Sequence, residues 1–364
     1  MKRTDRSELG LITRRSSLKG LGAASCLLTM GLPDLAAAQG IDQKIQKAAA
    51  AEGKLSVMFQ TSASPETANE IIKKFNARYA FLDVSFTINS TYQVMNRFTA
   101  ELSARRVVTD CVMLPSNLSQ TNKYLNGGAI GNYTISQDAA FTSDAKHTGL
   151  WYAWTRETAV TAYRKNALSP EEKKLIRTYK GLGDPRFKGR LGINGITNSV
   201  TVTGAYALHV HPDQSLWRGL VANKPRVKAT TPALIDGLLS GEYDVALFSA
   251  WASTANPAKT GAPLEFGNTA LTPVLYVPGA IPANAPHPNA ARLWQDWITS
   301  KEGQDVWASV TGATSARADA VKPWVRQQPW FFEDPKTHKP IDWDDFTKKE
   351  AEVTARFRKD FQAA

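Results

Sequence analysis

Short apolar runs alternate with amphipathic stretches over residues 54–114. Three runs have the length and composition of buried strands, and two segments between them repeat apolar positions at helical spacing. The strands are expected at 54–59, 82–86 and 109–114, and the helices at 65–79 and 92–105. Ser64 and Pro65 suit the N-cap and first turn of the first helix. This alternation predicts parallel βαβ units and an α/β fold.

Two extended segments divide the rest of the chain. The stretch 151–163 has few breaks and can cross from one lobe to another, and a second stretch near 268–277 can return. The other strands are expected at 191–193 and 244–248, and the other helices at 201–210, 232–239, 288–300, 302–309 and 345–361. Residues 249–253 are expected to form a loop after the strand 244–248. The pattern therefore predicts two lobes that share crossing strands.

The N-terminus has the order of an export signal. Arg14 and Arg15 precede an apolar run at 20–32, and Ala36 and Ala38 provide small residues before a cut at Gln39. The paired arginines are typical of the twin-arginine (Tat) signal, although Ser17 stands where that signal prefers a large apolar residue, so a Sec signal is the alternative. We therefore expect a signal peptide over 1–38 and a periplasmic protein.

Composition narrows the class of protein further. The chain has 364 residues, of which 43% are hydrophobic, enough for about two domains. The net charge of +11 is scattered, and the chain has no basic run, which argues against a nucleic-acid partner. Cys111 is the one cysteine beyond the signal, so it cannot form an internal disulfide. A monomer is expected.

Motifs for catalysis are missing from the sequence. The five histidines include the pair His209 and His211, but Pro212 follows and no third metal ligand is near. The chain has no P-loop and no nucleophile elbow. We expect neither an enzyme nor a bound cofactor or metal; a periplasmic enzyme is the alternative class.

Four segments in order carry a family resemblance. They are 187–193 (FKGRLGI), 241–247 (GEYDVAL), 284–291 (NAPHPNAA) and 300–304 (SKEGQ). Together they resemble the family-1 extracellular solute-binding proteins of ABC importers, in particular their ferric-binding branch. The resemblance implies two Rossmann-like lobes joined by crossing strands, with a ligand cleft between them, the type II periplasmic binding protein fold. It also implies a small-molecule ligand and a permease partner in the inner membrane.

The two extended segments set the expected lobe boundaries, and the resemblance implies a function. Lobe 1 is expected over 40–150 and 276–312, and lobe 2 over 156–270 and 313–364. The expected function is capture of a small anionic or polar organic solute for import by an ABC transporter. A periplasmic ligand-sensing protein is an alternative.

The residues that hold iron in the ferric branch do not match. The adjacent tyrosines that follow the strand 244–248 in that branch are replaced by Trp251 and Ala252. The anion-holding arginines of the crossing segment fall at Glu157 and Ala159. Ferric ion held by a different ligand set is therefore a further alternative.

Polar and aromatic residues after the strands are the candidate ligand-binding residues. They are Ser62, Ser64, Ser116, Asn117, Thr155, Arg156, Thr197, Asn198, Ser199, Ser249, Trp251 and Tyr276. Hydroxyl and amide groups dominate this set, which suits a neutral or anionic solute. We expect the loop 194–199 and Ser62 or Ser64 to hold the solute's head beside free helix N–H groups, with Arg156 supplying charge and Trp251 or Tyr276 an apolar wall. For every hydroxyl the alternative is helix capping, and for the aromatic residues it is core packing.

Overall fold

The computed structural model describes residues 43–60, 64–197, 199–269, 273–333 and 341–362. The expected signal peptide and two candidate site residues, Ser62 and Asn198, lie outside the described residues. Within these ranges no helix is long and apolar enough to cross a membrane.

The strands form a mixed sheet in the order β2-β1-β3-β10-β5-β8-β6-β7. One end holds the parallel strands β1 (Lys54–Gln60), β2 (Asp83–Asn89) and β3 (Cys111–Met113). The other end holds the parallel strands β6 (Leu191–Asn194), β7 (Arg226–Lys228) and β8 (Val245–Ala250). The remaining strands are β4 (Lys146–His147), β5 (Trp151–Arg164), β9 (Leu264–Asn268), β10 (Val274–Ala280) and β11 (Phe332–Glu333).

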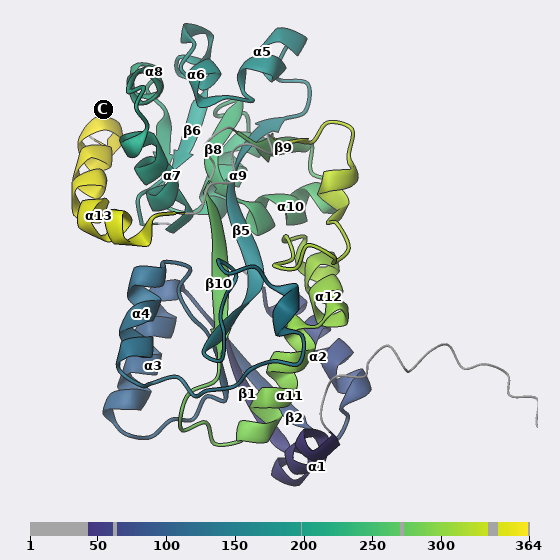
Figure 1. Ribbon diagram of the computed structural model, residues 1–364. Coiled ribbons are helices and arrows are strands. Elements are labelled where there is room, and N and C mark those ends of the chain that lie inside the picture. The colour runs from purple at the N-terminus through teal and green to yellow at the C-terminus, as the bar shows by residue number, and fades with distance from the viewer. Residues whose placement is uncertain (1–42, 61–63, 198, 270–272, 334–340, 363–364) are drawn as a thin grey trace, which may run out of the picture. The chain divides into compact units, whose positions relative to one another are not determined.

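Strand β5 belongs to both ends of the sheet. Its first part pairs with β10, from Trp151 opposite Ala280 to Thr158 opposite Val274. Its second part pairs with β8 and β9, up to Arg164. Because β10 also pairs with β3, the chain returns to the first end of the sheet after building the second. Figure 1 shows β5 and β10 running between the two groups of elements.

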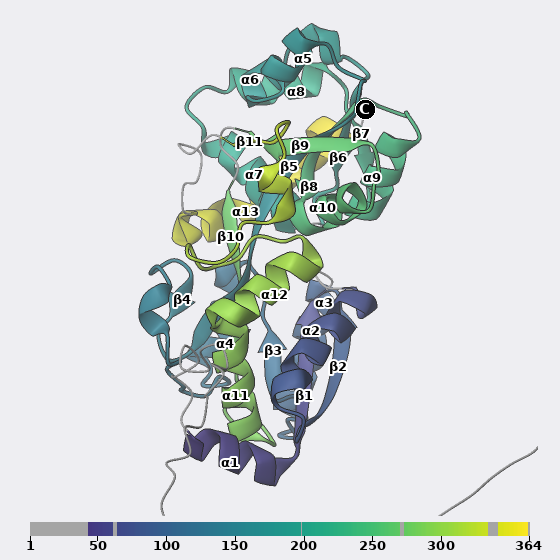
Figure 2. The same cartoon turned by 90° about the vertical axis from the view of Figure 1, so that its right-hand side faces the viewer.

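Helices cover both ends of the sheet (Figures 1 and 2). Around β1–β3 lie α1 (Gln43–Glu52), α2 (Pro65–Arg78), α3 (Thr91–Ser103), α4 (Leu118–Asn126), α11 (Pro288–Thr299) and α12 (Lys301–Thr311). Around β6–β8 lie α5 (Pro170–Leu175), α6 (Tyr179–Leu182), α7 (Ser199–Val210), α8 (Ser215–Ala222), α9 (Thr231–Leu239), α10 (Trp251–Lys259) and α13 (Trp343–Phe357). We call the first group lobe 1 and the second lobe 2; the boundaries expected from the sequence stay a prediction.

Aromatic side chains fill the core of lobe 1. Phe59 on β1 makes ring contacts with Trp154, Trp294 and Trp307, all of which are buried. Since these rings come from β5, α11 and α12, the late helices complete the core that the first strands begin. Burying large aromatic rings supplies much of the stability of such a core.

The tail helix α13 completes lobe 2. It packs against α7, and Phe346 and Phe357 are buried in the core of that lobe. The Tyr206 hydroxyl of α7 donates a hydrogen bond to Asp345 at 2.8 Å. A weaker set of contacts links α13 to α4 of lobe 1. The tail therefore approaches both lobes.

One expected element is wrong. Residues 249–253 were expected to form a loop, but β8 continues to Ala250 and α10 begins at Trp251. The Trp251 side chain fits the core, so the chain enters a helix directly instead of making a polar turn. By contrast, the helix expected at 65–79 forms as Pro65–Arg78, with Ser64 and Thr67 completing a capping box.

Candidate binding cleft

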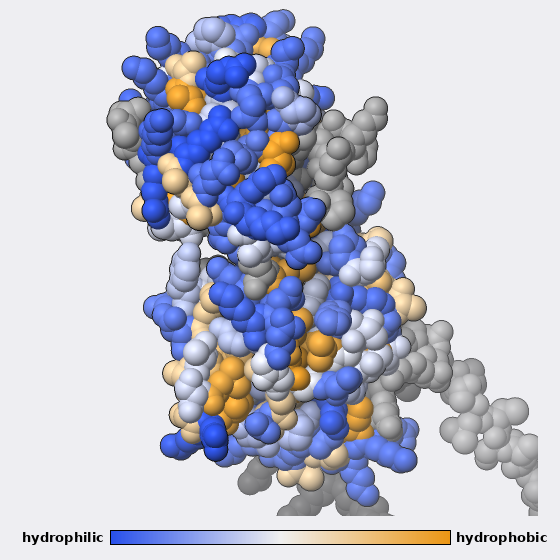
Figure 3. All heavy atoms as spheres, turned by 60° about the vertical axis from the view of Figure 1, so that its left-hand side comes forward, coloured by the Kyte–Doolittle hydropathy of each residue, from blue (hydrophilic) through white to orange (hydrophobic). Residues whose placement is uncertain are grey.

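A hollow of about 540 Å³ lies where strands of both lobes end. Its walls include residues that end or directly follow β1, β2 and β3 of lobe 1 and β6, β7 and β8 of lobe 2. The lining also contains one residue of β5, Glu157, and two of α13, Phe346 and Glu350. Figure 3 turns this side of the molecule forward and shows the surface hollowed between the two lobes. Such convergence of carboxyl strand ends is where α/β sheets bind ligands.

Two buried amides hold the strand ends that frame the cleft. The side-chain NH₂ of Gln60 donates to the carbonyls of Met113 and Leu114, and its oxygen accepts from Thr91 at 2.9 Å. Asn194 in lobe 2 donates to the Thr231 hydroxyl and to the Phe248 carbonyl. The NH₂ group of each amide is engaged by the protein and helps to set the shape of the cleft, whereas Asn194 Oδ1 has no hydrogen-bond partner among the described residues.

Helix N-termini surround the cleft. Thr91 of α3, Ser199 of α7, Thr231 of α9 and Ala252 of α10 all line it from the first turn of their helices. Helix α10 differs from α3 and α9, because its N-cap Ala250 provides no side-chain hydrogen bond. Its first N–H groups are therefore available to an acceptor, and the positive end of the helix dipole favours negative charge there.

Glu157 is the unusual residue of the cleft wall. No hydrogen bond or ion pair of its carboxyl occurs among the described residues, and desolvation by burial is the sole cause that shifts its pKa. Burial raises the pKa of Glu157 to about 7. A carboxyl in this position is neutral or charged near physiological pH depending on what faces it.

Glu350 brings a second carboxyl to the cleft from α13. Burial raises the pKa of Glu350, while a hydrogen bond from Asn117 and the charge of Lys123 act in the opposite direction. Asn117 precedes α4 in lobe 1, so this contact joins the tail helix to the opposite lobe. Glu350 is therefore partly compensated, whereas Glu157 is not.

Four of the candidate residues from the sequence line this cleft. They are Ser116, Asn117, Thr197 and Ser199. Three other hydroxyl residues have structural partners: Ser64 caps α2, Thr155 donates to the Thr314 carbonyl, and Ser249 bonds Thr254. Both Thr155 and Ser249 are fully buried. For these three residues the structure shows capping or packing contacts, and their part in ligand binding stays a prediction.

Arg156 and Tyr276 lie elsewhere. Both line a separate hollow of about 300 Å³, together with Lys146, His147 and Trp343. Neighbouring residues of a strand point to opposite faces, so Arg156 faces away from the cleft that Glu157 lines. The structure therefore does not bring Arg156 or Tyr276 to the side chains around Ser199.

Trp251 belongs to the core of the protein. Its side chain is 1% exposed, packs edge-on against Phe266 and Phe331, and donates its indole N–H to the Gly312 carbonyl at 2.6 Å. The expected apolar wall at Trp251 is thus replaced by core packing, because the residue opens a helix whose inner face meets β9.

The sequence reasoning missed several residues of the cleft. Tyr92, Thr230 and Thr231 follow the ends of β2 and β7, so the rule that located Ser116 and Thr197 applies to them as well. Glu350 had no such signal, since no local pattern shows that a tail helix returns to the cleft. Among the described residues, no three His, Cys, Asp or Glu side chains are grouped to hold a metal ion.

Two α/β lobes joined by β5 and β10, with a polar cleft between their strand ends, define a two-lobed binding protein. A profile of the family "Bacterial extracellular solute-binding protein" matches residues 66–310, and the chain belongs to this family. The matching family is family 11 of these solute-binding proteins, whereas the sequence motifs indicated family 1. Membership of a solute-binding family confirms the expectation of a binding protein rather than an enzyme.

Solved structures of similar fold agree with this assignment. The substrate-binding protein of an ABC transporter from Agrobacterium tumefaciens superimposes with a TM-score of 0.67 at 18% identity, covering 85% of this chain and 97% of that one. A Trichodesmium protein, IdiA (FutA), solved with iron and citrate, gives 0.65 at 17% identity, covering 84% and 99%. These likenesses confirm the type II periplasmic binding protein fold.

A curated relative matches part of the chain. Iron uptake protein A1 of Synechocystis is 32% identical over 104 residues, which is 27% of this chain and 28% of the relative. The match thus spans little more than a quarter of that protein's length.

Proposed function

We propose that this chain is the periplasmic substrate-binding component of an ABC importer, and that it captures a small polar organic solute in the cleft. The observation that carries the proposal is the convergence of six parallel strand ends from two lobes on one hollow. Family membership supports the binding role, and the Agrobacterium structure is described as the same component of such a transporter. An inner-membrane permease is the partner that this role requires.

The solute's anionic or acceptor head is proposed to face the helix N-termini of lobe 2. The uncapped first turn of α10 presents N–H groups to the cleft, and Ser199 lines the cleft at the start of α7. Mass spectrometry of solute released from the purified protein identifies the solute, and calorimetric titration then measures its affinity.

A variant with added charge tests this placement. Ser253→Glu puts a carboxylate in the first turn of α10, where it suits the helix dipole but repels an acidic head, so affinity should fall at least about tenfold. The control Asn69→Glu adds the same charge to an exposed position of α2. Equal affinity of both variants and the parent would place the head elsewhere.

Export is proposed to depend on residues 1–38, which lie outside the described residues. Changing Arg14 and Arg15 to Lys should leave precursor in the cytoplasm if the signal uses the twin-arginine pathway. Cell fractionation measures this, and normal export of the variant would favour the Sec pathway.

Ferric ion is the second candidate solute. The curated relative is named an iron uptake protein, and the Trichodesmium structure contains iron and citrate. Ionisable oxygen donors in the described cleft lining include the phenol of Tyr92 and the carboxyls of Glu157 and Glu350, which suit a hard cation. Titration with ferric citrate tests this: a stoichiometric coloured complex, lost in Tyr92→Phe, would establish iron as the cargo.

A further inference from the structure

The carboxyl of Glu157 differs in its hydrogen bonding from other buried or partly buried carboxyls of the protein. Asp110 accepts hydrogen bonds from the backbone N–H groups of Ser56 and His287, and Asp296 accepts from Ser136. Glu157 has no such donor among the described residues, yet it lines a hollow that is open to a solute. Sheltered carboxyls are ordinarily paired, because an unpaired one costs free energy.

Among the residues that the structure describes, the lining of the cleft provides no counter-charge. Its described residues include two carboxyls, Glu157 and Glu350, and no lysine, arginine or histidine. A purely anionic solute would meet two acids and would depend on helix N-termini alone. A purely cationic solute would leave the uncapped N-terminus of α10 without an acceptor.

We propose that the solute of the cleft is a small zwitterion, with a protonated amine that donates to Glu157 and an acidic group that accepts from the first turn of α10. This inference rests on the proposed function and specifies its substrate class. An ammonium donates strong charge-assisted hydrogen bonds to a carboxylate, and the acidic group is stabilised by free N–H groups. Both unmatched features of the cleft are then satisfied by one molecule.

The size of the hollow agrees with an organic solute. A water molecule occupies about 30 Å³ of liquid, so about 540 Å³ holds many more atoms than a bare ion. The two proposed anchors also lie on different walls of the cleft, because Glu157 is on the shared strand β5 and α10 belongs to lobe 2.

The test uses matched pairs of solutes that differ in the amine. The purified mature chain is titrated at pH 8 with aminated solutes: 4-aminobutyrate, β-alanine, taurine and the twenty standard amino acids. Each is compared with the same molecule without its amine, namely butyrate, propionate, ethanesulfonate and the deaminated acids. Inorganic phosphate, citrate and ferric citrate complete the panel. At least one aminated member should bind about 10- to 150-fold more tightly than its deaminated partner, the range of one charge-assisted hydrogen bond.

Two variants assign that preference to one carboxyl. Glu157→Gln should reduce the preference for the aminated member to less than about threefold, while Glu350→Gln, whose carboxyl already has Asn117 and Lys123 beside it, should retain it. Thermal denaturation confirms that both variants fold. An amine preference that survives Glu157→Gln overturns the inference, as does a panel in which no aminated member binds.

Failure of the inference differs from failure of the proposed function. If the protein binds phosphate, citrate or another solute without an amine, and Ser253→Glu weakens that binding, the cleft is a solute site of another class. If the purified protein neither releases a solute nor binds any member of the panel, the proposed function fails as well.

Discussion

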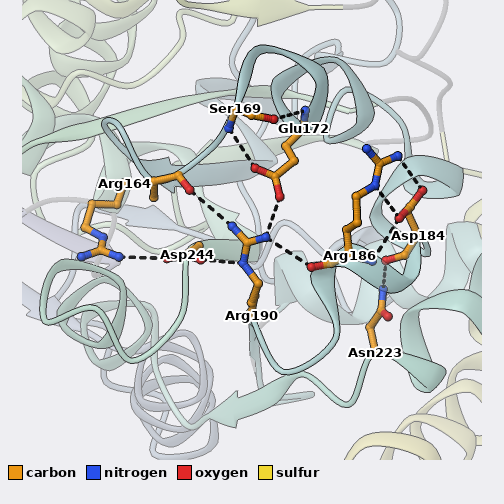
Figure 4. A network of polar contacts seen from close by, with 9 residues as sticks. Arg164, Ser169, Glu172, Asp184, Arg186, Arg190, Asn223 and Asp244 are labelled. Atoms are coloured by element: carbon orange, nitrogen blue, oxygen red, sulfur yellow. Dashed lines mark hydrogen bonds and ion pairs between the residues drawn. The ribbon is translucent and has the colours of Figure 1, made fainter.

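Two polar regions of the sheet, one in lobe 2 and one in the cleft between the lobes, differ in how their charges are matched. At the far end of β8, Asp244 lies between two arginines, at 2.8 Å from Arg164 and 2.7 Å from Arg190. Arg190 also contacts Glu172, whose carboxylate in turn accepts from the backbone N–H of Ser169 (Figure 4). In the cleft, Glu157 has no hydrogen-bond or ion-pair partner within the described part of the chain.

The difference distinguishes charges that stabilise the fold from polar groups that are left for a ligand. In the network of Figure 4 each carboxylate meets a guanidinium or a backbone donor, so the charges join β5, β6, β8 and α5. Among the described residues, the unmatched groups that line the cleft include a carboxyl and an uncapped helix N-terminus. Polar groups that a protein leaves unsatisfied in a concave site are those that a ligand can satisfy.

Trp251→Ala should have the largest effect on stability. Removal of a buried tryptophan from a core typically costs about 3–5 kcal/mol, and this variant also leaves the Gly312 carbonyl without its donor. Chemical denaturation should show that loss. Trp251→Phe keeps an aromatic ring and should lose less stability. If Trp251→Ala kept the parental stability but bound the solute more weakly, Trp251 would be a residue of the binding site.

Asp244→Ala should have the next largest effect. The variant leaves two partly buried arginines without their shared carboxylate, and we expect a loss of about 2–3 kcal/mol, less than for a fully buried pair because solvent reaches the site. Ligand affinity should stay unchanged. The control Lys301→Ala removes an exposed i,i+4 pair and should cost at most about 0.5 kcal/mol.

Glu157→Gln should stabilise the ligand-free protein, in contrast to Asp244→Ala. The folded protein holds a proton on Glu157 more tightly than the unfolded chain does, since its pKa rises from 4.5 to about 7. Stability is therefore lost as pH rises through this window. Full burial would make the loss about 3 kcal/mol, and partial solvent access reduces the expected gain of the variant to about 1–2 kcal/mol.

Denaturation at two pH values measures this gain. It should be present at pH 8 and vanish near pH 4, where both states hold the proton. The control Glu70→Gln removes an exposed i,i+3 pair with Lys73 and should change stability by at most about 0.5 kcal/mol. A gain that is equal at both pH values would mean that Glu157 is not desolvated.

More of the fold than of the binding site could be predicted from the sequence. Local patterns predicted α2 with its cap at Ser64, and the rule of carboxyl strand ends located Ser116 and Thr197 in the cleft. The orientation of a side chain on a strand was not predictable without the register, so Arg156 and Glu157 were both possible cleft residues. Glu350 was missed because its contact with Asn117 joins residues far apart in the chain.

The smallest effect is expected for Arg156→Ala. Arg156 lines the hollow with Tyr276 and Trp343, on the opposite face of β5 from Glu157, so its loss should change solute affinity in the cleft by less than about twofold. Arg156 Nε has no hydrogen-bond partner among the residues that the structure describes, which also predicts little change in stability. Calorimetric titration of Arg156→Ala and Glu157→Gln with the same solute compares the contributions of two adjacent residues of β5 to affinity. If Arg156→Ala instead reduced solute affinity about 10- to 150-fold, an acidic head of the solute would reach this arginine. Arg156, rather than Glu157, would then determine which class of solute binds.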